Sequence, residues 1–242
     1  MRFLQLAGAA LMLGLVGCSA MNTARPLKDG QHAVGLTFGG ATVAYEVSPS
    51  LEQPEGDILN IPLPIAIIEG RSGLPKLYGK DIDVQYGLNL TALQYDMIGL
   101  QTGATMLLVE QQGYRPAWSV HDRLYFYNNW FSNSRTEESQ SWWAATQIET
   151  TISWKLRGQL FYMGVAETLD FKLPSLLLSP FGGMELIRSG RTPGFGLQLE
   201  LRHFAINKKA DIEIIDWVEP LGQGALGMFI GMNYKFKRRG QK

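Results

Sequence analysis

The chain of 242 residues has very little cysteine and histidine: one cysteine, Cys18, and three histidines, His32, His121 and His203. A single cysteine excludes an internal disulfide and any metal cluster that needs several thiolates. No two of the histidines share a metal-ligand spacing. The sequence therefore indicates no metal site and no cofactor.

Net charge and long apolar runs are also missing. Lys and Arg total 22, as do Asp and Glu, so no net charge favours nucleic acid or an acidic substrate as a partner. After residue 17, no apolar run approaches the roughly 18 residues that indicate a transmembrane helix, and mean hydropathy is −0.05. A helical membrane protein is therefore excluded.

The first 17 residues have the organisation of a processed leader. A charged start, Met1-Arg2, precedes an apolar stretch over Phe3–Val16 and then the small residues Gly17-Cys18-Ser19. An uncleaved transmembrane anchor is the alternative interpretation, but about 14 apolar residues is short against the roughly 20 that span a bilayer. A buried Cys18 thiol within an ordinary signal region is a second alternative. We expect a leader over residues 1–17.

Leu15-Val16-Gly17-Cys18 resembles the lipobox of bacterial lipoproteins. The resemblance implies that the Cys18 thiol receives a diacylglyceryl group, that the chain is cut before Cys18, and that the new N-terminus is acylated, commonly with palmitate. Ser19 stands where an aspartate would resemble an inner-membrane retention signal, so the resemblance implies the outer membrane. Two or more acyl chains anchor a protein firmly, whereas one holds weakly.

Residues 18–31 show no periodicity and are predicted to be a lipid-anchored tether, whereas residues 32–242 are dominated by period-two alternation. Alternate side chains of a strand point to opposite faces. The clearest example is 81–91, where one face is apolar and the other polar. The apolar set is Ile82, Val84, Tyr86, Leu88 and Leu90; the polar set includes Asp81, Asp83, Gln85 and Asn89.

About ten strands are predicted, most of them longer than the 5 to 6 residues typical of globular proteins. In the first of them, Gly39-Gly40 changes the apolar parity, as a β-bulge would. The predicted ranges are 34–46, 60–69, 81–91, 97–110, 115–128, 144–156, 158–166, 179–188, 194–203 and 226–237.

Long strands with one apolar face are typical of a transmembrane β-barrel, although a soluble β-sandwich has the same alternation. The connections favour the barrel. Four of the five odd-numbered connections are long, and three of the four even-numbered ones are tight, with 70–80 the exception. Outer-membrane barrels have short periplasmic turns and long external loops, and an even strand number leaves both termini on the periplasmic side, as a lipid at Cys18 requires.

The last strand, Gly227-Met228-Phe229-Ile230-Gly231-Met232-Asn233-Tyr234-Lys235-Phe236, is similar to the terminal strand of small outer-membrane β-barrel proteins. The resemblance implies an antiparallel up-and-down barrel of about ten strands (8–12), assembled by the outer-membrane insertion machinery. These barrels usually end on an aromatic residue, whereas Phe236 is followed by six more residues. Aromatic residues near predicted strand ends suggest interfacial belts: Tyr125, Tyr127, Trp130, Phe131, Trp142, Trp143 and Trp154.

The polar faces would line the lumen of such a barrel, and the charged ones are predicted to form a self-plugging network: Asp81, Asp83, Glu149, Glu200, Arg202 and Lys235. A ten-stranded barrel is expected to have little more room than an eight-stranded one, whose interior side chains just fill. Arg202-His203 loosely resembles the histidine strand of lipid A deacylase barrels, but the serine two residues after the histidine is missing.

The sequence thus predicts a non-enzymatic, lipid-anchored β-barrel in the outer membrane of a Gram-negative bacterium, with a structural, adhesive or narrow-pore role. Its expected partners are membrane lipid, through Cys18 and the barrel exterior, and the insertion machinery, with no nucleic acid. A lipid-tethered soluble periplasmic β-domain that binds a lipid or another apolar ligand is the alternative. A barrel enzyme that modifies outer-membrane lipid is the second.

Overall fold

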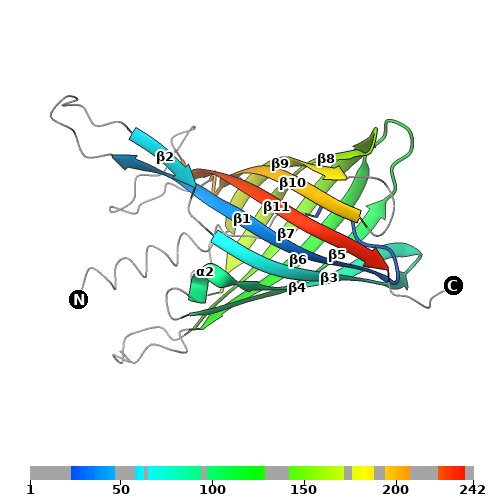
Figure 1. Cartoon of the computed structure of the whole chain (residues 1–242), viewed down its shortest axis with the longest axis horizontal. Helices are drawn as coiled ribbons and strands as arrows, with labels where there is room; N and C mark the ends of the chain where they lie inside the picture. The colour runs from blue at the N-terminus through cyan, green and yellow to red at the C-terminus, as the bar shows by residue number, and fades with distance from the viewer. Residues whose placement is uncertain are drawn as a thin grey trace.

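Ten antiparallel strands form a closed barrel in the computed structural model (Figure 1). The structure describes residues 23–46, 58–62, 65–93, 97–128, 142–171, 176–187, 194–207 and 223–237. The barrel strands are β1 (Gln31–Glu46), β3 (Ile65–Leu77), β4 (Lys80–Asn89), β5 (Ile98–Val109), β6 (Ala117–Asn128), β7 (Trp142–Leu156), β8 (Gln159–Asp170), β9 (Leu176–Ile187), β10 (Gly194–Phe204) and β11 (Ala225–Lys237).

The last strand pairs with the first, which closes the sheet. β1 pairs antiparallel with β11 from Gln31↔Lys237 to Ala41↔Gly227, and on its other edge with β3 from His32↔Ser72 to Gly39↔Ile65. Every other neighbour in the barrel is also the neighbour in sequence. The prediction of an up-and-down antiparallel barrel of about ten strands is confirmed.

Two small elements lie outside this ring. β2 (Ile58–Pro62) pairs only with the outer part of β1, Thr42–Glu46, so the two strands form a ribbon beyond the barrel (Figure 1). α2 (Leu90–Leu93) follows β4, and Asn89 Oδ1 accepts a hydrogen bond from the Ala92 amide at 3.1 Å. No helix in the described part of the chain is long and apolar enough to cross a membrane.

The two ends of the barrel differ. At one end, which we call the turn end, two-residue turns join β3 to β4 and β7 to β8. Tyr78-Gly79 (φ 50° and 75°) and Arg157-Gly158 (φ 50° and 85°) both have two positive φ angles, the signature of the type I′ turns that suit twisted hairpins. Gln31 and Lys237 begin and end the barrel here. The opposite, loop end bears α2 and the β1–β2 ribbon.

Two predicted strand boundaries were wrong. The strand predicted over 81–91 ends at Asn89, because Leu90 and Thr91 belong to α2. We expected a strand over 60–69 and a connection over 70–80, whereas β3 continues to Leu77 and the connection is Tyr78-Gly79. Arg71 and Gly73 point inward in this stretch and break the apolar pattern along the sequence, but not the pairing with β4. The connection between β3 and β4 is therefore short, like the other even-numbered connections.

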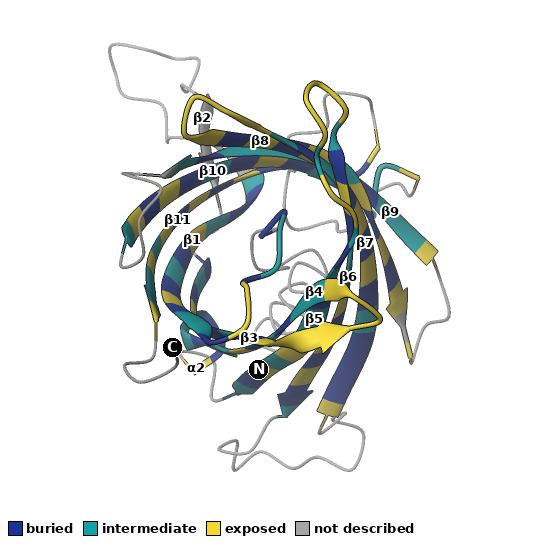
Figure 2. Cartoon of the chain, turned by 90° about the vertical axis from the view of Figure 1, so that its right-hand side faces the viewer, coloured by how far each residue is buried: buried dark blue, intermediate teal, exposed yellow. Residues whose placement is uncertain are grey.

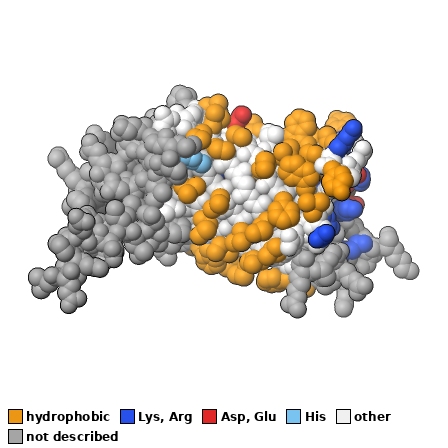
Figure 3. Space-filling model, turned by 90° about the horizontal axis from the view of Figure 1, so that it is seen from above, with side chains coloured by type: hydrophobic (Ala, Val, Ile, Leu, Met, Phe, Trp, Pro, Cys, Tyr) orange, Lys and Arg blue, Asp and Glu red, His pale blue; other side chains and the backbone are white. Residues whose placement is uncertain are grey.

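The predicted alternation is confirmed, with its polar face inside the barrel. Asp83, Thr105 and Thr151 are completely buried, whereas Tyr86, Ile148 and Met163 are about half exposed. Figure 2 looks along the barrel from the turn end and shows buried and exposed residues alternating along the strands. Apolar side chains consequently gather on the outer surface (Figure 3).

The bulge expected at Gly39-Gly40 is absent, because the pairing of β1 with β11 passes through both residues without a register shift. The apolar parity changes for another reason: Ala41 is buried inside the barrel, in a cluster with Phe204, Ala225 and Phe229. Phe229, the exception in the alternation of the last strand, is thus explained as an inward side chain.

The predicted aromatic belts are correct for only part of the set. Trp142 is about half exposed on the outer face, and Trp154 Nε1 donates to the Tyr114 carbonyl at 3.2 Å near the turn end. Tyr125, Tyr127 and Trp143 instead point into the barrel and are buried. Period two explains this, because neighbours such as Trp142 and Trp143 face opposite sides. Trp130 and Phe131 lie outside the described residues.

Candidate functional site: a plugged lumen

The segment Thr23–Gly30, which we call the luminal segment, lies inside the ring of strands (Figure 2). Thr23, Ala24 and Leu27 are buried. These residues belong to the predicted tether 18–31, and the last of that range, Gln31, already belongs to β1. A ten-stranded barrel therefore has room for a peptide as well as its own side chains, contrary to the expectation of little extra space.

Thr23 reaches the middle of the lumen. Its Oγ1 lies 2.9 Å from His121 Nε2 and accepts from Gln85 Nε2 at 3.3 Å. Gln85 Nε2 also donates to Thr105 Oγ1 at 2.7 Å. One side chain of the luminal segment thus contacts β4 and β6 directly, and Gln85 connects it to Thr105 of β5.

Backbone groups of the luminal segment are satisfied by inward side chains, as a buried peptide requires. The Leu27 amide donates to Asp83 Oδ2 at 2.7 Å, and the Ala24 carbonyl accepts from Ser119 Oγ at 2.7 Å. Arg71 Nη2 donates to the Arg25 carbonyl at 2.9 Å. The barrel wall thus recognises this segment through its main chain.

The Arg25 side chain extends the hydrogen bonds of the luminal segment toward the turn end. Its guanidinium donates to Gln111 Oε1 at 2.6 Å and to Ser153 Oγ at 3.0 Å. Lys28 passes so close to β3 that a Cβ at Gly73 would lie 2.0 Å from the Lys28 carbonyl oxygen. Gly73 is therefore required for the approach of the luminal segment.

Apolar contacts also hold the luminal segment in place. Ala24 belongs to a buried cluster with Leu160, Tyr162, Ala166 and Phe181 of β8 and β9. Ala24 has φ 47°, a left-handed conformation uncommon for a non-glycine residue. The surrounding bonds to Thr23 and Arg25 hold it there.

A charge network lies beside the luminal segment. Arg202 Nη2 is 3.0 Å from Glu149 Oε1 and 2.8 Å from Glu200 Oε1, and its guanidinium lies 4.7 Å from the centre of the Phe181 ring. Arg71 pairs with Asp83 and Lys235 with Glu185. Five of the six charged residues predicted for the lumen thus form ion pairs there: Asp83, Glu149, Glu200, Arg202 and Lys235. Their partners Arg71 and Glu185 were not predicted, and Asp81 pairs instead with the exposed Lys76.

The loop end of the lumen is apolar. Eight buried residues form one cluster there, and Ala92 of α2 contributes to it: Ile65, Ile67, Ala92, Met97, Tyr125, Tyr127, Trp143 and Ala145. The luminal segment, the charge network and this cap all lie in the described lumen. The exposed fractions of His121, Arg123, Glu149, Glu200 and Arg202 are 2% or less, so these side chains are shielded from bulk solvent.

The three histidines lie apart, in different environments. His121 is in the lumen, His32 stacks on Phe236 with ring centres 5.6 Å apart, and His203 Nε2 lies 2.7 Å from the Gln223 carbonyl oxygen. The described residues include no group of three or more His, Cys, Asp or Glu side chains that could hold a metal. The partner of His203 is a carbonyl rather than the hydroxyl that a deacylase nucleophile would supply.

Cys18 and the other lipobox residues, Leu15, Val16 and Gly17, lie outside the described residues, so their modification stays a prediction. No local pattern in the sequence indicated that Thr23 and Arg25 enter the lumen. The one available signal was strand number, because a barrel wider than an eight-stranded one has interior space that its own side chains do not fill.

No family model matches the chain, and no curated protein matches it. Among solved structures, the chain is similar to that of Ail, the attachment invasion locus protein of Yersinia pestis. The two chains are 7% identical, and the match covers 86% of this chain and 99% of the Ail chain. The TM-score is 0.23, too low for an argument from likeness. The fold is established by the strand pairing of the chain itself.

Proposed function

We propose that this protein is an outer-membrane β-barrel, anchored in addition by a lipid on Cys18, with a sealed lumen and a structural or adhesive role. The observation that carries the proposal is the inverted distribution of side chains on a closed sheet. Polar and charged residues are buried inside, and large apolar residues are exposed outside. Hydrocarbon, rather than water, suits such an exterior.

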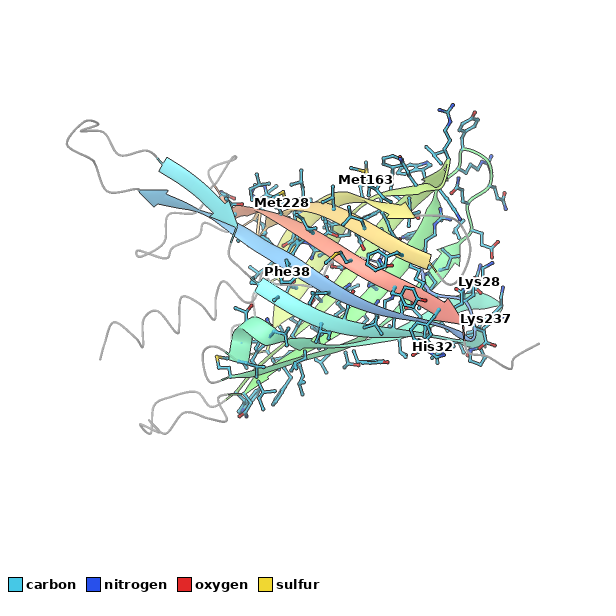
Figure 4. The ribbon with its side chains drawn as sticks, in the orientation of Figure 1. Lys28, His32, Phe38, Met163, Met228 and Lys237 are labelled. Atoms are coloured by element: carbon cyan, nitrogen blue, oxygen red, sulfur yellow. The ribbon has the colours of Figure 1, made fainter. Side chains whose placement is uncertain are left out.

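The apolar exterior runs around the barrel. Half-exposed outward residues come from all of its strands, among them Phe38, Ile68, Tyr86, Leu100, Leu124, Ile148, Met163, Leu176, Leu201 and Ile230. Figure 3 shows apolar side chains gathered over one face of the barrel, and Figure 4 shows Phe38, Met163 and Met228 among the outward side chains. Monomeric soluble proteins rarely expose an apolar patch above a few hundred Å², so the soluble periplasmic domain is the weaker alternative.

A shallow groove on this face bears on the apolar-ligand alternative. It has a volume of about 720 Å³ and is lined mainly by Val34, Ile68, Gly70, Tyr86, Leu100 and Phe126. All of these residues belong to the outer face, where the Tyr86 ring lies directly over Gly70: a Cβ at Gly70 would be 2.3 Å from the ring. The groove would therefore hold acyl chains of surrounding lipid rather than a ligand enclosed by the protein.

The contents of the lumen support a structural or adhesive role over a narrow pore. A narrow pore would need a continuous polar path, whereas the luminal segment, the charge network and the apolar cap all occupy the described lumen. A structural or adhesive role needs no path. The β1–β2 ribbon stands beyond the barrel at the loop end, where adhesive contacts would form.

The luminal segment also shortens the lipid anchor. Cys18 precedes Thr23 by five residues, and five residues span at most about 17 Å. Because Thr23 is held by His121 and Gln85 in the lumen, an acylated Cys18 would stay close to the barrel and would not be separated from it by a long flexible tether.

Heat-modifiable migration and lipid labelling test the two parts of the proposal. Unboiled protein extracted from membranes in detergent should migrate differently from boiled protein, and the wild-type chain should incorporate labelled palmitate, unlike Cys18→Ser. The Cys18→Ser chain should still fractionate with membranes, because its barrel exterior remains. Recovery of Cys18→Ser as a soluble, monodisperse periplasmic protein would contradict the barrel and support the tethered soluble domain.

A further inference from the structure

We propose that the turn end of the barrel is a binding surface for anionic phospholipid headgroups. This inference rests on the proposed function, because it needs the barrel to lie in a membrane. Its evidence is independent of that proposal: the charges of the chain, which cancel in total, are distributed unevenly along the barrel axis.

Exposed charges at the turn end are mostly cationic. Lys28, Lys237 and His32 lie together at this end in Figure 4, and Figure 3 shows Lys and Arg side chains gathered there. Among the described residues, seven exposed cations and three anions belong to this rim, a net charge of +4. The cations are Lys28, Lys76, Lys80, Arg115, Lys155, Arg157 and Lys237; the anions are Asp29, Asp81 and Glu110.

The rest of the described barrel has no such cluster of cations. Every exposed Lys or Arg among the described residues belongs to the turn end, whereas Asp122 and Glu167 are exposed farther along the strands. The equal totals of Lys+Arg and Asp+Glu thus conceal a charge asymmetry along the barrel axis.

Aromatic residues place the basic rim at headgroup depth. Trp118, Phe195 and Tyr234 are exposed on the outer face within a few residues of the turn end. Trp154 is tied there by its bond to the Tyr114 carbonyl. Outward aromatic side chains at this position favour the interface between hydrocarbon and headgroups. Lysine and arginine beside them extend their charged ends into the headgroup layer.

A headgroup phosphate fits this surface better than a compact ligand does. The seven cations are spread over hairpins of β3–β4, β5–β6 and β7–β8 and over both ends of the barrel chain, so they form a ring rather than a pocket. A ring at constant depth contacts many lipids of one leaflet at once. Anionic lipid surfaces attract clustered Lys and Arg in this way.

The experiment uses the full chain, purified from membranes in a zwitterionic detergent and titrated with short-chain phosphatidylglycerol while tryptophan fluorescence is recorded. The charge-reversal variant is Lys80→Glu, Arg115→Glu, Lys155→Glu and Arg157→Glu together. The matched control keeps every charge: Lys80→Arg, Arg115→Lys, Lys155→Arg and Arg157→Lys. All four side chains are exposed.

We expect wild type and the control to bind phosphatidylglycerol at least tenfold more tightly than short-chain phosphatidylcholine, and the reversal variant to lose this preference. Raising salt from 50 to 500 mM should weaken the preference, because exposed charges are screened. Inorganic phosphate at equal concentration should not compete. Equal binding of the two lipids by wild type, an unchanged reversal variant, or competition by inorganic phosphate would overturn the inference.

Heat-modifiable migration of each variant separates this outcome from the proposed function. A folded, membrane-inserted barrel without lipid preference contradicts only the headgroup surface. A chain that never behaves as a membrane barrel contradicts the proposed function itself. Binding of purified peptidoglycan by wild type but not by the reversal variant, with no preference between lipids, would also overturn the inference and assign the basic rim to another polymer.

Discussion

At the scale of single residues, the stability of this protein depends on buried charged side chains that pair with one another. Arg202 bridges Glu149 and Glu200, and all three are at most 1% exposed. Removal of one partner leaves an uncompensated charge shielded from bulk solvent, whereas loss of the whole set need not destabilise the fold.

Arg202→Ala should therefore lower the free energy of unfolding by about 3–5 kcal/mol, measured by urea denaturation in micelles. The double variant Arg202→Met and Glu200→Gln should recover much of this loss, because it neutralises Glu200 as well as Arg202, whereas Glu149 keeps the buried Arg123 as a cationic neighbour. Arg157→Ala, in an exposed turn, is the control and should change stability by no more than about 0.5 kcal/mol. Equal effects of Arg202→Ala and Arg157→Ala would contradict the network.

Gly39 is a second residue whose identity is imposed by its surroundings. It has φ 137°, and a Cβ there would lie 2.0 Å from the Met228 carbonyl oxygen at the β1–β11 seam. Gly39→Ala should lower stability by at least about 1–3 kcal/mol through backbone strain alone. Gly182→Ala is the control, since its Cβ would meet nothing nearer than 3.7 Å. Similar unfolding midpoints for the two variants would refute this account of the seam.

At the scale of elements, the luminal segment is the feature that distinguishes this barrel from a simple closed sheet. It is bound through side chains of β3, β4, β6 and β7, including Asp83, Ser119 and His121. These contacts make the segment part of the folded barrel rather than a tether outside it.

Cysteine labelling of the folded protein tests the position of the segment. Cys18 is the only cysteine, so a Cys18→Ser background allows single replacements. Thr23→Cys should react with a water-soluble maleimide at least tenfold more slowly than Asp29→Cys, because Thr23 is buried and Asp29 is exposed. Both should react alike after unfolding in urea. Equal rates in the folded barrel would show that residues 23–30 are a free tether.

The strands themselves were largely predictable from sequence. Polar and apolar residues alternate along a strand whether its polar or its apolar face is the buried one. Asp83 and Tyr86 were assigned to opposite faces before any pairing was known, and they lie there. The end of β3 was missed since Arg71 and Gly73 interrupt the apolar pattern. The luminal segment was missed because its bonds join Thr23 and Leu27 to residues at least 56 positions away, a relationship that no local pattern records.

At the scale of the whole molecule, the side chains are arranged for a non-aqueous exterior. The lumen is largely polar, the outer face is apolar, and the two ends differ in charge and in the length of their connections. Burial of charge inside and exposure of apolar surface outside would be unfavourable in water. Lipid around the barrel removes that conflict.

Spin-label accessibility tests this claim most directly. Single labels at Ile148→Cys, Met163→Cys and Ile230→Cys, in the Cys18→Ser chain reconstituted in liposomes, report from outward positions that are 48%, 52% and 43% exposed. Gln112→Cys, in an exposed turn, is the water-facing control. We predict that oxygen relaxes the three outward labels strongly and that a water-soluble nickel chelate hardly affects them. Nickel accessibility equal to that of Gln112→Cys at all three positions would contradict it.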